Sequence, residues 1–307
     1  MNKVTVILPT YNRAQSITRS IRSVLSQTYQ DFEFIIIDDG SIDNTEKIVR
    51  KFQEKDKRIR YIRHNKNKGS ATARNTGIKA AKREYIAFQD SDDEWLPEKL
   101  EKQMKVFKNV PPKVGVVYTG FWKIDGDKRK YIPSSRVKQK EGDIHKKLLN
   151  GNFVGTPTVL IKKECFEKVG IFDEHLCALE DWELWIRVSK HYHFKFIDEP
   201  LLISHYTSNS VNINLNSLIW ASKLILEEHF EEFKRERKAL IQQIHRIGSL
   251  LCQNGKMVQG RNYLSQALRS YPLNPKYLMS IFISLFGQNT YNYSVKIYRR
   301  IKTLIDI

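Results

Sequence analysis

The chain has 307 residues, 41% of them hydrophobic, which is enough for one large domain, or one and a half, with a real core. No apolar stretch approaches the ~20 residues of a membrane-spanning helix, and no charged start with a longer apolar run indicates a signal peptide. The three cysteines lack disulfide or metal-site spacing, which favours a reducing compartment. We therefore expect a cytoplasmic protein.

The net charge of +18 is dense in the last third, where residues 219–307 carry +8 of it. Such a surface attracts polyanions, namely anionic lipid, phosphate-bearing substrates or nucleic acid. The same charge can also serve solubility alone, so charge by itself identifies no partner.

Up to about residue 120, short apolar runs alternate with segments of helical spacing. Strands are expected at residues 3–9, 32–37, 59–63, 85–88 and 114–119, and helices at 16–29, 43–52, 69–82 and 97–108. Strand–helix alternation repeated four times predicts an α/β domain with a mixed, mainly parallel sheet between helices.

Beyond residue 120 the pattern changes and finally becomes helical. A hairpin around Gly126, strands at 156–162, 194–197 and 201–203, and helices at 163–169 and 180–188 come first. Only helices are expected after residue 215, at 218–233, 239–253, 258–271, 275–285 and 294–305. We therefore predict a first domain over residues 1–215 and an α-helical C-terminal region over residues 216–307.

Polar loops follow four of the predicted parallel strands. In such sheets ligands bind outside the carboxyl ends of the strands, which places residues 10–13, 38–41, 67–69 and 90–93 along one edge. The last loop holds Asp90, Asp92 and Asp93, whose mutual repulsion is costly without a cation among them. Mg²⁺ or Mn²⁺ bound with a substrate diphosphate suits these carboxylates, although a solvated turn that caps the next helix is the alternative.

Four motifs in order resemble those of glycosyltransferase family 2. They are VTVILPTYNR, FIIIDDGSIDNT, NKGSATARNTGIKAAKREYIAFQDSDDEWLPEKL and EDWELWIRV, within residues 4 to about 210. No Gly-rich dinucleotide or P-loop signature is present. The resemblance implies a GT-A fold over residues 1–215 and transfer of a sugar, with inversion, from a nucleoside-diphosphate donor assisted by Mg²⁺ or Mn²⁺.

The resemblance also implies a donor site. Tyr11 would lie near the nucleotide base and Asp39 would accept a hydrogen bond from its edge, while residues 69–75 would flank the ribose and diphosphate. Each residue alone has a structural alternative, such as a helix cap or a surface ion pair. Carried over by position, the nucleotide-sugar site is Pro9, Thr10, Tyr11, Arg13, Asp38, Asp39, Gly69, Ala73, Arg74, Asn75, Asp90 and Ser91.

For the metal, the family's D-x-D motif matches Asp90-Ser91-Asp92, so Asp92 would be a direct ligand and Asp90 would reach the ribose or the metal. Many family members end the catalytic domain with a Tyr-Arg-x-His-like segment, where this chain has Ser204-His205-Tyr206-Thr207. His205 is thus either a metal or diphosphate contact, or a histidine packed at a strand end.

The family's ED motif matches Glu180-Asp181. An inverting transfer needs one base to take the proton of the acceptor hydroxyl. Asp181 would be this base, with Glu180 positioning the acceptor. Both acids could instead only complement a helix N-terminus. Trp182 and Trp185 could form an acceptor platform or pack in the core.

The leading hypothesis is an inverting glycosyltransferase with a glycan or lipid-linked acceptor, making cell-surface polysaccharide from a donor that is expected to be UDP-linked. The alternatives are a sugar-phosphate nucleotidyltransferase and a non-catalytic basic module that binds anionic lipid or nucleic acid. Acids on the binding rim argue against nucleic acid there. The basic amphipathic helix at 294–305 either lies on the inner face of the membrane or packs on helix 275–285.

Overall fold

The computed structural model describes residues 3–205 and 214–305, and the side chains of these residues through Tyr298. It comprises two compact units. The first, the sheet unit, consists of Met1–Leu148, Asn152–His175 and Glu180–Ser210. The second, the helical unit, consists of Leu149–Gly151, Leu176–Leu179 and Val211–Ile307, so two short segments that interrupt the sheet unit in sequence belong to it.

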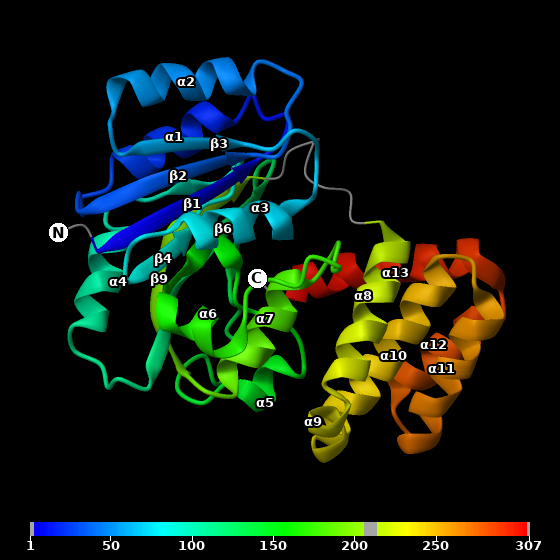
Figure 1. The fold of residues 1–307 in the computed structure, drawn as a ribbon. Coiled ribbons are helices and arrows are strands. Elements are labelled where there is room, and N and C mark those ends of the chain that lie inside the picture. The colour runs from blue at the N-terminus through cyan, green and yellow to red at the C-terminus, as the bar shows by residue number, and fades with distance from the viewer. Residues whose placement is uncertain (1–2, 206–213, 306–307) are drawn as a thin grey trace. The chain divides into compact units, whose positions relative to one another are not determined.

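The sheet unit is built on one nine-stranded sheet (Figure 1). The strand order is β3-β2-β1-β4-β8-β6-β9-β5, with β7 paired to β6. Their bounds are β1 Val4–Thr10, β2 Phe32–Asp38, β3 Ile59–Arg63, β4 Tyr85–Phe88, β5 Glu94–Trp95, β6 Val114–Asp125, β7 Lys128–Ile132, β8 Val159–Lys162 and β9 His193–His205.

The first four strands in sequence are parallel neighbours, and antiparallel pairs complete the sheet. β1 pairs in parallel with β2 and β4, and β2 with β3. β8 is antiparallel to both β4 and β6, whereas β6 and β9 run parallel. The expected mixed α/β fold followed by helices is therefore confirmed, and the carboxyl ends of β1, β2 and β4 lie at one edge.

Seven helices accompany these strands in the sheet unit. They are α1 Ile17–Leu25, α2 Thr45–Lys55, α3 Ser70–Ala80, α4 Lys99–Phe107, α5 His145–Leu148, α6 Lys163–Val169 and α7 Glu180–Ser189. Helices α1 to α4 alternate with the strands in the order that the sequence predicted. The helix predicted at 97–108 begins at Lys99, because Glu98 is its N-cap and Pro97 lies in the turn before it.

Strands β1 and β2 are buried over their whole length because helices cover both faces of this part of the sheet. On one face, Val6 and Phe34 belong to a core cluster with Ile21 of α1 and Met104 of α4. Successive side chains of a strand point to opposite faces, so Ile7 points the other way, toward Gly77 of α3. This two-sided burial explains the nearly continuous apolar runs of the sequence.

Residues 193–205 form one long strand, β9, where the sequence predicted two short ones. Pro200 lies between the two predicted segments and lacks the N–H that a ladder needs. The pairing with β6 shifts register on both sides of Gly120, which lies opposite Pro200, so the irregularity accommodates the proline and the strand continues. The strand predicted at 156–162 begins only at Val159, because Thr156–Thr158 form a 3₁₀ turn around Pro157.

The helical unit contains the remaining helices of the described chain. They are α8 Leu215–Glu228, α9 Phe230–Arg235, α10 Arg237–Gln253, α11 Met257–Ser270, α12 Pro275–Ser284 and α13 Gly287–Ile305. Tyr291 and Val295 of α13 pack with Cys252 of α10 and Leu264 of α11. The helix predicted from residue 294 thus begins at Gly287, and no described helix is long and apolar enough to cross a membrane.

The contact between α3 and the sheet depends on a glycine. A Cβ atom on Gly77 would lie 2.5 Å from Cγ2 of Ile7 and 2.9 Å from Cδ1 of Ile37. We expect Gly77→Ala to lower the free energy of unfolding by about 1–3 kcal/mol, the usual cost of an extra methyl group in a packed core. Urea unfolding of both proteins measures this difference.

Gly155→Ala is the matched control, because its Cβ would have no neighbour closer than 3.4 Å and its φ of −75° suits alanine. This variant should be unchanged or slightly more stable. Equal unfolding midpoints for Gly77→Ala and the wild type would contradict the close packing of α3 on the sheet.

Candidate active site

The loop after β1 is tied to the loop after β2 by hydrogen bonds. The backbone N–H of Asn12 donates to Oγ of Ser41 at 2.9 Å, and that of Arg13 donates to Oγ1 of Thr45 at 2.8 Å. Asn12 has a φ of +51°, so the chain turns sharply there. Tyr11, next to this turn, is 41% exposed, which leaves one face of its ring available at the edge of the sheet.

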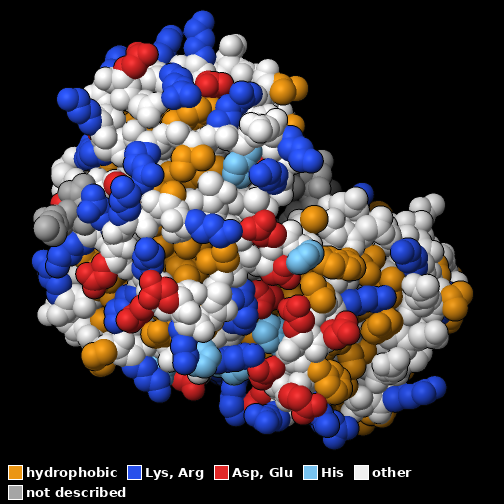
Figure 2. Space-filling model, viewed as in Figure 1, with side chains coloured by type: hydrophobic (Ala, Val, Ile, Leu, Met, Phe, Trp, Pro, Cys, Tyr) orange, Lys and Arg blue, Asp and Glu red, His pale blue; other side chains and the backbone are white. Residues whose placement is uncertain are grey.

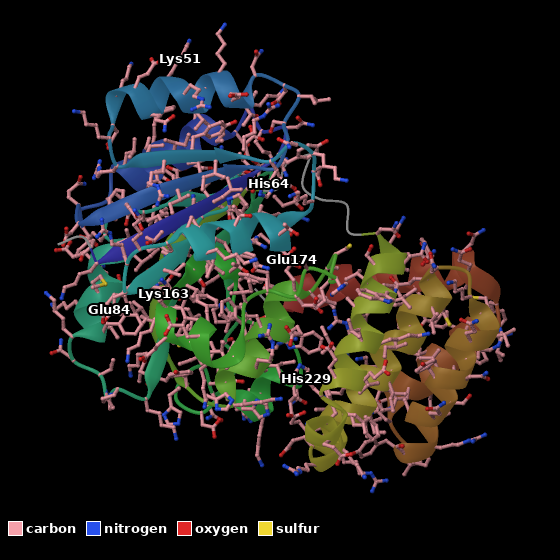
Figure 3. The ribbon with its side chains drawn as sticks, in the orientation of Figure 1. Lys51, His64, Glu84, Lys163, Glu174 and His229 are labelled. Atoms are coloured by element: carbon pink, nitrogen blue, oxygen red, sulfur yellow. The ribbon has the colours of Figure 1, made fainter. Side chains whose placement is uncertain are left out.

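The two carboxylates after β2 are buried and hold the rim together. Oδ1 of Asp38 accepts from the N–H of Ser41 at 2.7 Å, and its Oδ2 accepts from the hydroxyl of Tyr61 at 2.7 Å. Asp39 accepts from the N–H of Gly69 at 2.7 Å and lies 2.7 Å from Nδ1 of His64 (Figure 3). The structure therefore assigns both acids a role in fixing the loops, and contact of Asp39 with a base stays a prediction.

Helix α3 begins directly after Gly69, and its predicted site residues differ in what they contact. Gly69, with a φ of +95°, precedes the helix, and Ala73 is fully buried. Nδ2 of Asn75 donates to the carbonyl of Phe172 at 2.8 Å and to Glu174 at 2.9 Å, so Asn75 fixes the segment before α7. Of the predicted α3 residues, this leaves Arg74 as the one that contacts other predicted site acids.

Arg74 joins the two acidic motifs of the site. Its Nη2 donates to Oδ1 of Asp90 at 3.0 Å, and its Nη1 donates to Oε1 of Glu180 at 2.8 Å. Burial alone would lower the pKa of Arg74, but the charges of Asp90 and Glu180 raise it above its usual value. The guanidinium therefore stays charged, and it holds Asp90 together with Glu180, which lies 106 positions after Arg74 in the sequence.

The acidic loop after β4 is held by the first turns of α1. Oγ of Ser16 donates to the carbonyl of Ser91 at 2.9 Å, Nη2 of Arg19 to that of Asp92 at 2.7 Å, and Oγ of Ser20 to that of Asp93 at 2.7 Å. The carbonyls of Ser91, Asp92 and Asp93 are thus bonded to this segment, which fixes the backbone of the loop that carries the three carboxylates. This anchoring by α1 was not predicted from the sequence.

Negative charge in this loop is only partly compensated. Burial and the neighbouring Asp90 raise the pKa of Asp92, although Arg13, with Nη2 3.6 Å from Oδ2, lowers it in part. Burial, Asp90 and Asp92 raise the pKa of Asp93 well above its ordinary value. A hard divalent cation favours such oxygen ligands and relieves this repulsion, so the residues fit Mg²⁺ or Mn²⁺.

His205 is the last residue of β9, and its Nε2 lies 3.6 Å from Oε2 of Glu94 on β5. Burial and Arg19 lower the pKa of the ring, while Glu94 and Asp92 oppose this. The lowered pKa keeps the ring neutral at pH 7, and a neutral imidazole suits a metal ligand. The segment that follows, from Tyr206, lies outside the described residues, and the metal role of His205 stays a prediction.

Asp181 lies in the first turn of α7, and its carboxylate is partly buried. Its Oδ2 accepts from Nδ2 of Asn152 at 2.9 Å, and its Oδ1 accepts from the N–H of Trp182 at 2.7 Å. Burial and the charge of Glu180 raise the pKa of Asp181 to about 6, against the opposing effect of Arg74. A carboxylate with this pKa is ionised at neutral pH and is a stronger base than an ordinary aspartate.

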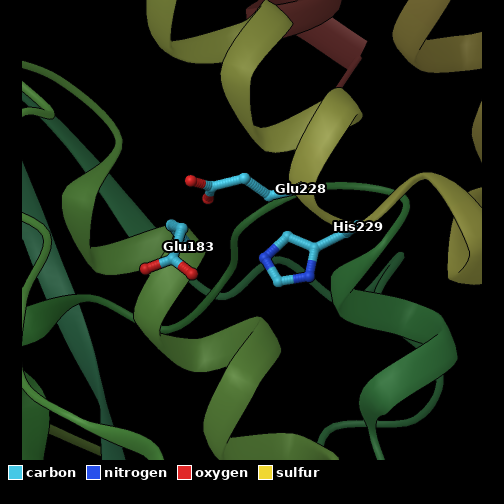
Figure 4. A group of neighbouring side chains, drawn as sticks. All are labelled: Glu183, Glu228 and His229. Atoms are coloured by element: carbon cyan, nitrogen blue, oxygen red, sulfur yellow. The ribbon is translucent and has the colours of Figure 1, made fainter.

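Other side chains of α7 belong to the core or to local pairs. The indoles of Trp182 and Trp185 are buried and donate to the carbonyls of Leu148 and Val154, so neither forms an acceptor platform. Glu183 (Figure 4) accepts two hydrogen bonds from Arg187, at 2.6 and 2.7 Å, which occupies its carboxylate. Core packing, the alternative considered for the tryptophans, is therefore confirmed.

Sequence reasoning missed Asn152 and Ser70, which contact the two acids of α7. Oγ of Ser70 donates to Oε1 of Glu180 at 3.0 Å. Asn152 lies in Asn150-Gly151-Asn152, a composition that indicates a turn and carries no sign of a site. Only the fold brings this turn to Asp181.

Removal of the bridging guanidinium tests how far the fold depends on it. We expect Arg74→Ala to destabilise the protein by about 3–5 kcal/mol, because two carboxylates lose the partner of a buried pair. Thermal and urea unfolding measure the loss.

The control, Lys195→Ala, removes an exposed pair with Glu141 at 2.7 Å and should cost only about 0–1 kcal/mol. A similar, small effect of both substitutions would show that Arg74 does not hold the two motifs together.

Comparison with known proteins places these residues in a family. The family model described as glycosyl transferase family 2 matches residues 5–170. A Rickettsia bellii protein named as an uncharacterized glycosyltransferase is 40% identical over 187 residues, which are 61% of this chain and 26% of that protein. The chain thus spans about a quarter of that relative's length.

A second relative and two solved structures extend the comparison. The Escherichia coli protein named UDP-Glc:alpha-D-GlcNAc-diphosphoundecaprenol beta-1,3-glucosyltransferase WfgD is 31% identical over 236 residues, 76% of this chain and 83% of its own. S. aureus TarS 1–349 in complex with UDP-GlcNAc matches with a TM-score of 0.69 and 20% identity over 97% of this chain and 92% of that chain. The mannosyltransferase PcManGT from Pyrobaculum calidifontis, in complex with GDP-Man and Mn2+, matches with a TM-score of 0.60 and 19% identity over 94% and 85%.

Proposed function

Because this chain belongs to glycosyltransferase family 2 and has a GT-A fold, we propose that it is a metal-dependent, inverting glycosyltransferase. Its donor is a nucleoside-diphosphate sugar, UDP-linked, and its acceptor is a hydroxyl of a glycan or lipid-linked sugar in cell-surface polysaccharide biosynthesis. The observation that carries the proposal is the bridge of Arg74 from Asp90 to Glu180, which joins the donor loop to the segment of the base.

The donor lies along the edge formed by the loops after β1, β2 and β4. Tyr11 offers its exposed ring to the base, and the buried residues Pro9 and Thr10 precede it at the end of β1. Asp38 and Asp39 act mainly by fixing these loops. Two relatives support a UDP-linked donor, because one is named for UDP-Glc and one was solved with UDP-GlcNAc.

The diphosphate end of the donor faces Arg13 and the acidic loop. Asp92 and Asp90, with His205, would hold Mg²⁺ or Mn²⁺, and the Mn2+ of the PcManGT complex supports this assignment. The ion would neutralise the charge that develops on the leaving diphosphate. Arg74 orients Asp90, since it donates directly to this carboxylate.

Asp181 takes the proton of the acceptor. The acceptor oxygen forms the new bond to the anomeric carbon, its proton moves to a carboxylate oxygen of Asp181, and the bond from the anomeric carbon to the diphosphate oxygen breaks. Attack from the face opposite the leaving group gives inversion. Asn152 orients the carboxylate through its 2.9 Å hydrogen bond, and Glu180 contacts the acceptor from the neighbouring position.

A lipid-linked acceptor is supported by the name of WfgD, which specifies a diphosphoundecaprenol substrate. Of the competing hypotheses, a non-catalytic basic module gives no reason for Asp90, Glu180 and Asp181 to gather around one buried arginine. The glycosyltransferase explains this arrangement with one reaction.

Nucleotide binding tests the donor site. Thermal unfolding should be measured with UDP, GDP, dTDP and CMP, each with and without Mn²⁺. We expect UDP with Mn²⁺ to raise Tm by several degrees, because a ligand at about 100 times its Kd adds about 2.7 kcal/mol to the stability of the native state. Asp92→Ala should abolish this shift.

The control for this substitution is Asp127→Ala, which removes an exposed aspartate in the β6–β7 turn and should keep the full shift. A nucleotide other than UDP would change the donor that we propose. If no nucleotide shifts Tm with or without Mn²⁺, the edge of the sheet is not a donor site.

The pH dependence of activity tests the base. Protonated Asp181 cannot accept a proton, so kcat/KM should fall as the pH falls through about 6, the pKa of this group. Asn152 lowers this pKa by its hydrogen bond. Asn152→Ala should therefore move the acidic limb of the profile to higher pH.

Asn109→Ala is the matched control, because the Asn109 side chain donates to the carbonyl of Lys105 in α4. Its profile should coincide with that of the wild type. An acidic limb that stays in place when Asn152 is removed would mean that another group accepts the proton. The anomeric configuration of the first product, read by NMR, reports inversion independently.

A further inference from the structure

Helix α12 exposes one apolar face. Its opposite face is buried, with Tyr277 packed against Ile241 and Ala267 and with Ser284 fully covered. The exposed residues are spaced by one, three or four positions, which places them along a single side of the helix and of the turn that follows it. They are between 44% and 65% exposed and form what we call the α12 surface: Leu278, Met279, Phe282, Leu285 and Phe286.

The α12 surface is an ordered feature of the helix. The rings of Phe282 and Phe286 stack edge to face with centroids 5.1 Å apart. Asn274 caps the helix, because its side chain accepts from the N–H of Lys276 and of Tyr277. An apolar patch of this kind on a protein surface indicates an interaction site.

The surrounding sequence has an unusual charge pattern. Between Arg237 and Ile305 there is no aspartate or glutamate, although the chain contains 34 acidic residues in total, and there are eleven lysines or arginines. Lys256, Arg269 and Lys296 are exposed. In Figure 2, hydrophobic and basic side chains both reach the surface of the helical unit on the face that is drawn.

Helix α13 adds exposed aromatic residues to this segment. Tyr293 and Tyr298 are 68% and 56% exposed, and Lys296 lies between them. Tyrosine and lysine are both suited to the boundary between lipid and water, because each has an apolar body and a polar tip. The packing of Val295 and Tyr291 orients α13 in the helical unit.

We infer that the α12 surface docks the protein onto an anionic lipid bilayer. Phenylalanine, leucine and methionine side chains would enter the boundary of the acyl chains, and the acid-free segment around them would attract the negative headgroups. The contact is peripheral, since no described helix could cross a membrane. A second copy of the chain is a poorer partner, because two acid-free basic segments would repel each other.

This inference deepens the proposed function and rests on it for its biological sense, because a lipid-linked acceptor lies at a membrane. The α12 surface lies wholly within the helical unit. Binding to lipid can therefore be measured without donor, metal or acceptor, so its outcome is separate from that of the nucleotide experiment.

Flotation of the full chain with lipid vesicles tests the docking. The vesicles are phosphatidylcholine with phosphatidylglycerol (about 7:3), or phosphatidylcholine alone, in ~0.1 M salt. We expect the protein to float with the anionic vesicles and much less with neutral ones. Phe282→Ser with Phe286→Ser should weaken binding to anionic vesicles by at least about tenfold, because two exposed rings no longer insert.

The matched control is Trp220→Ser with Phe230→Ser, which removes two aromatic residues of the same unit that are each 46% exposed. It should float like the wild type, and both double variants should keep their circular dichroism spectrum and the nucleotide-induced Tm shift. Three results would overturn the inference: no flotation of the wild type, equal loss in both double variants, or a dimer in sedimentation equilibrium that the Phe282 and Phe286 substitutions dissociate.

Discussion

The buried guanidinium of Arg74 is the interaction on which the candidate site depends. It lies on α3, whose position against the sheet is fixed by the absence of a side chain at Gly77. From there it donates to Asp90 at the end of β4 and to Glu180 at the start of α7. A charge in this position is tolerated only because both terminal nitrogens of the guanidinium are paired with carboxylates, and the two acids are tolerated near each other only because of it.

The loops around this bridge are fixed by backbone groups more than by packing. Asp39 accepts hydrogen bonds from the N–H groups of both Lys68 and Gly69. The hydroxyls of Ser16 and Ser20 donate to carbonyls of the acidic loop. Hydrogen bonds to buried carboxylates are strong and directional. The edge of the sheet is therefore ordered before any ligand binds, which reduces the entropy that donor binding must overcome.

Much of the sheet unit is predictable because its signals are local. The apolar runs of β1 and β2 and the acids that follow β2 and β4 can be read directly from neighbouring residues. Other features depend on partners far away in sequence. Asn152 looks like a turn residue until the fold places it beside Asp181, and β9 looks interrupted at Pro200 until Gly120 accommodates the irregularity.

Dependence on partners that are distant in sequence also explains why the packing of the C-terminal helices could not be predicted. A periodic pattern shows that a helix has an apolar face, but it does not show which surface covers that face. The sequence therefore left helix 294–305 with two equal interpretations. In the structure, this predicted helix is part of α13, which packs through Tyr291 and Val295 against α10 and α11. By contrast, Phe282 of α12 and Phe286 in the turn after it are exposed to solvent.

The distribution of charge connects these observations. The positive residues of the candidate site, Arg13 and Arg74, are matched by at least as many carboxylates, so the site does not account for a net charge of +18. The imbalance is greatest between residues 237 and 305, where no acid offsets the eleven basic residues. Selection for solubility alone would not also require large exposed apolar residues in the same segment. The combination of both is what an anionic membrane surface recognises.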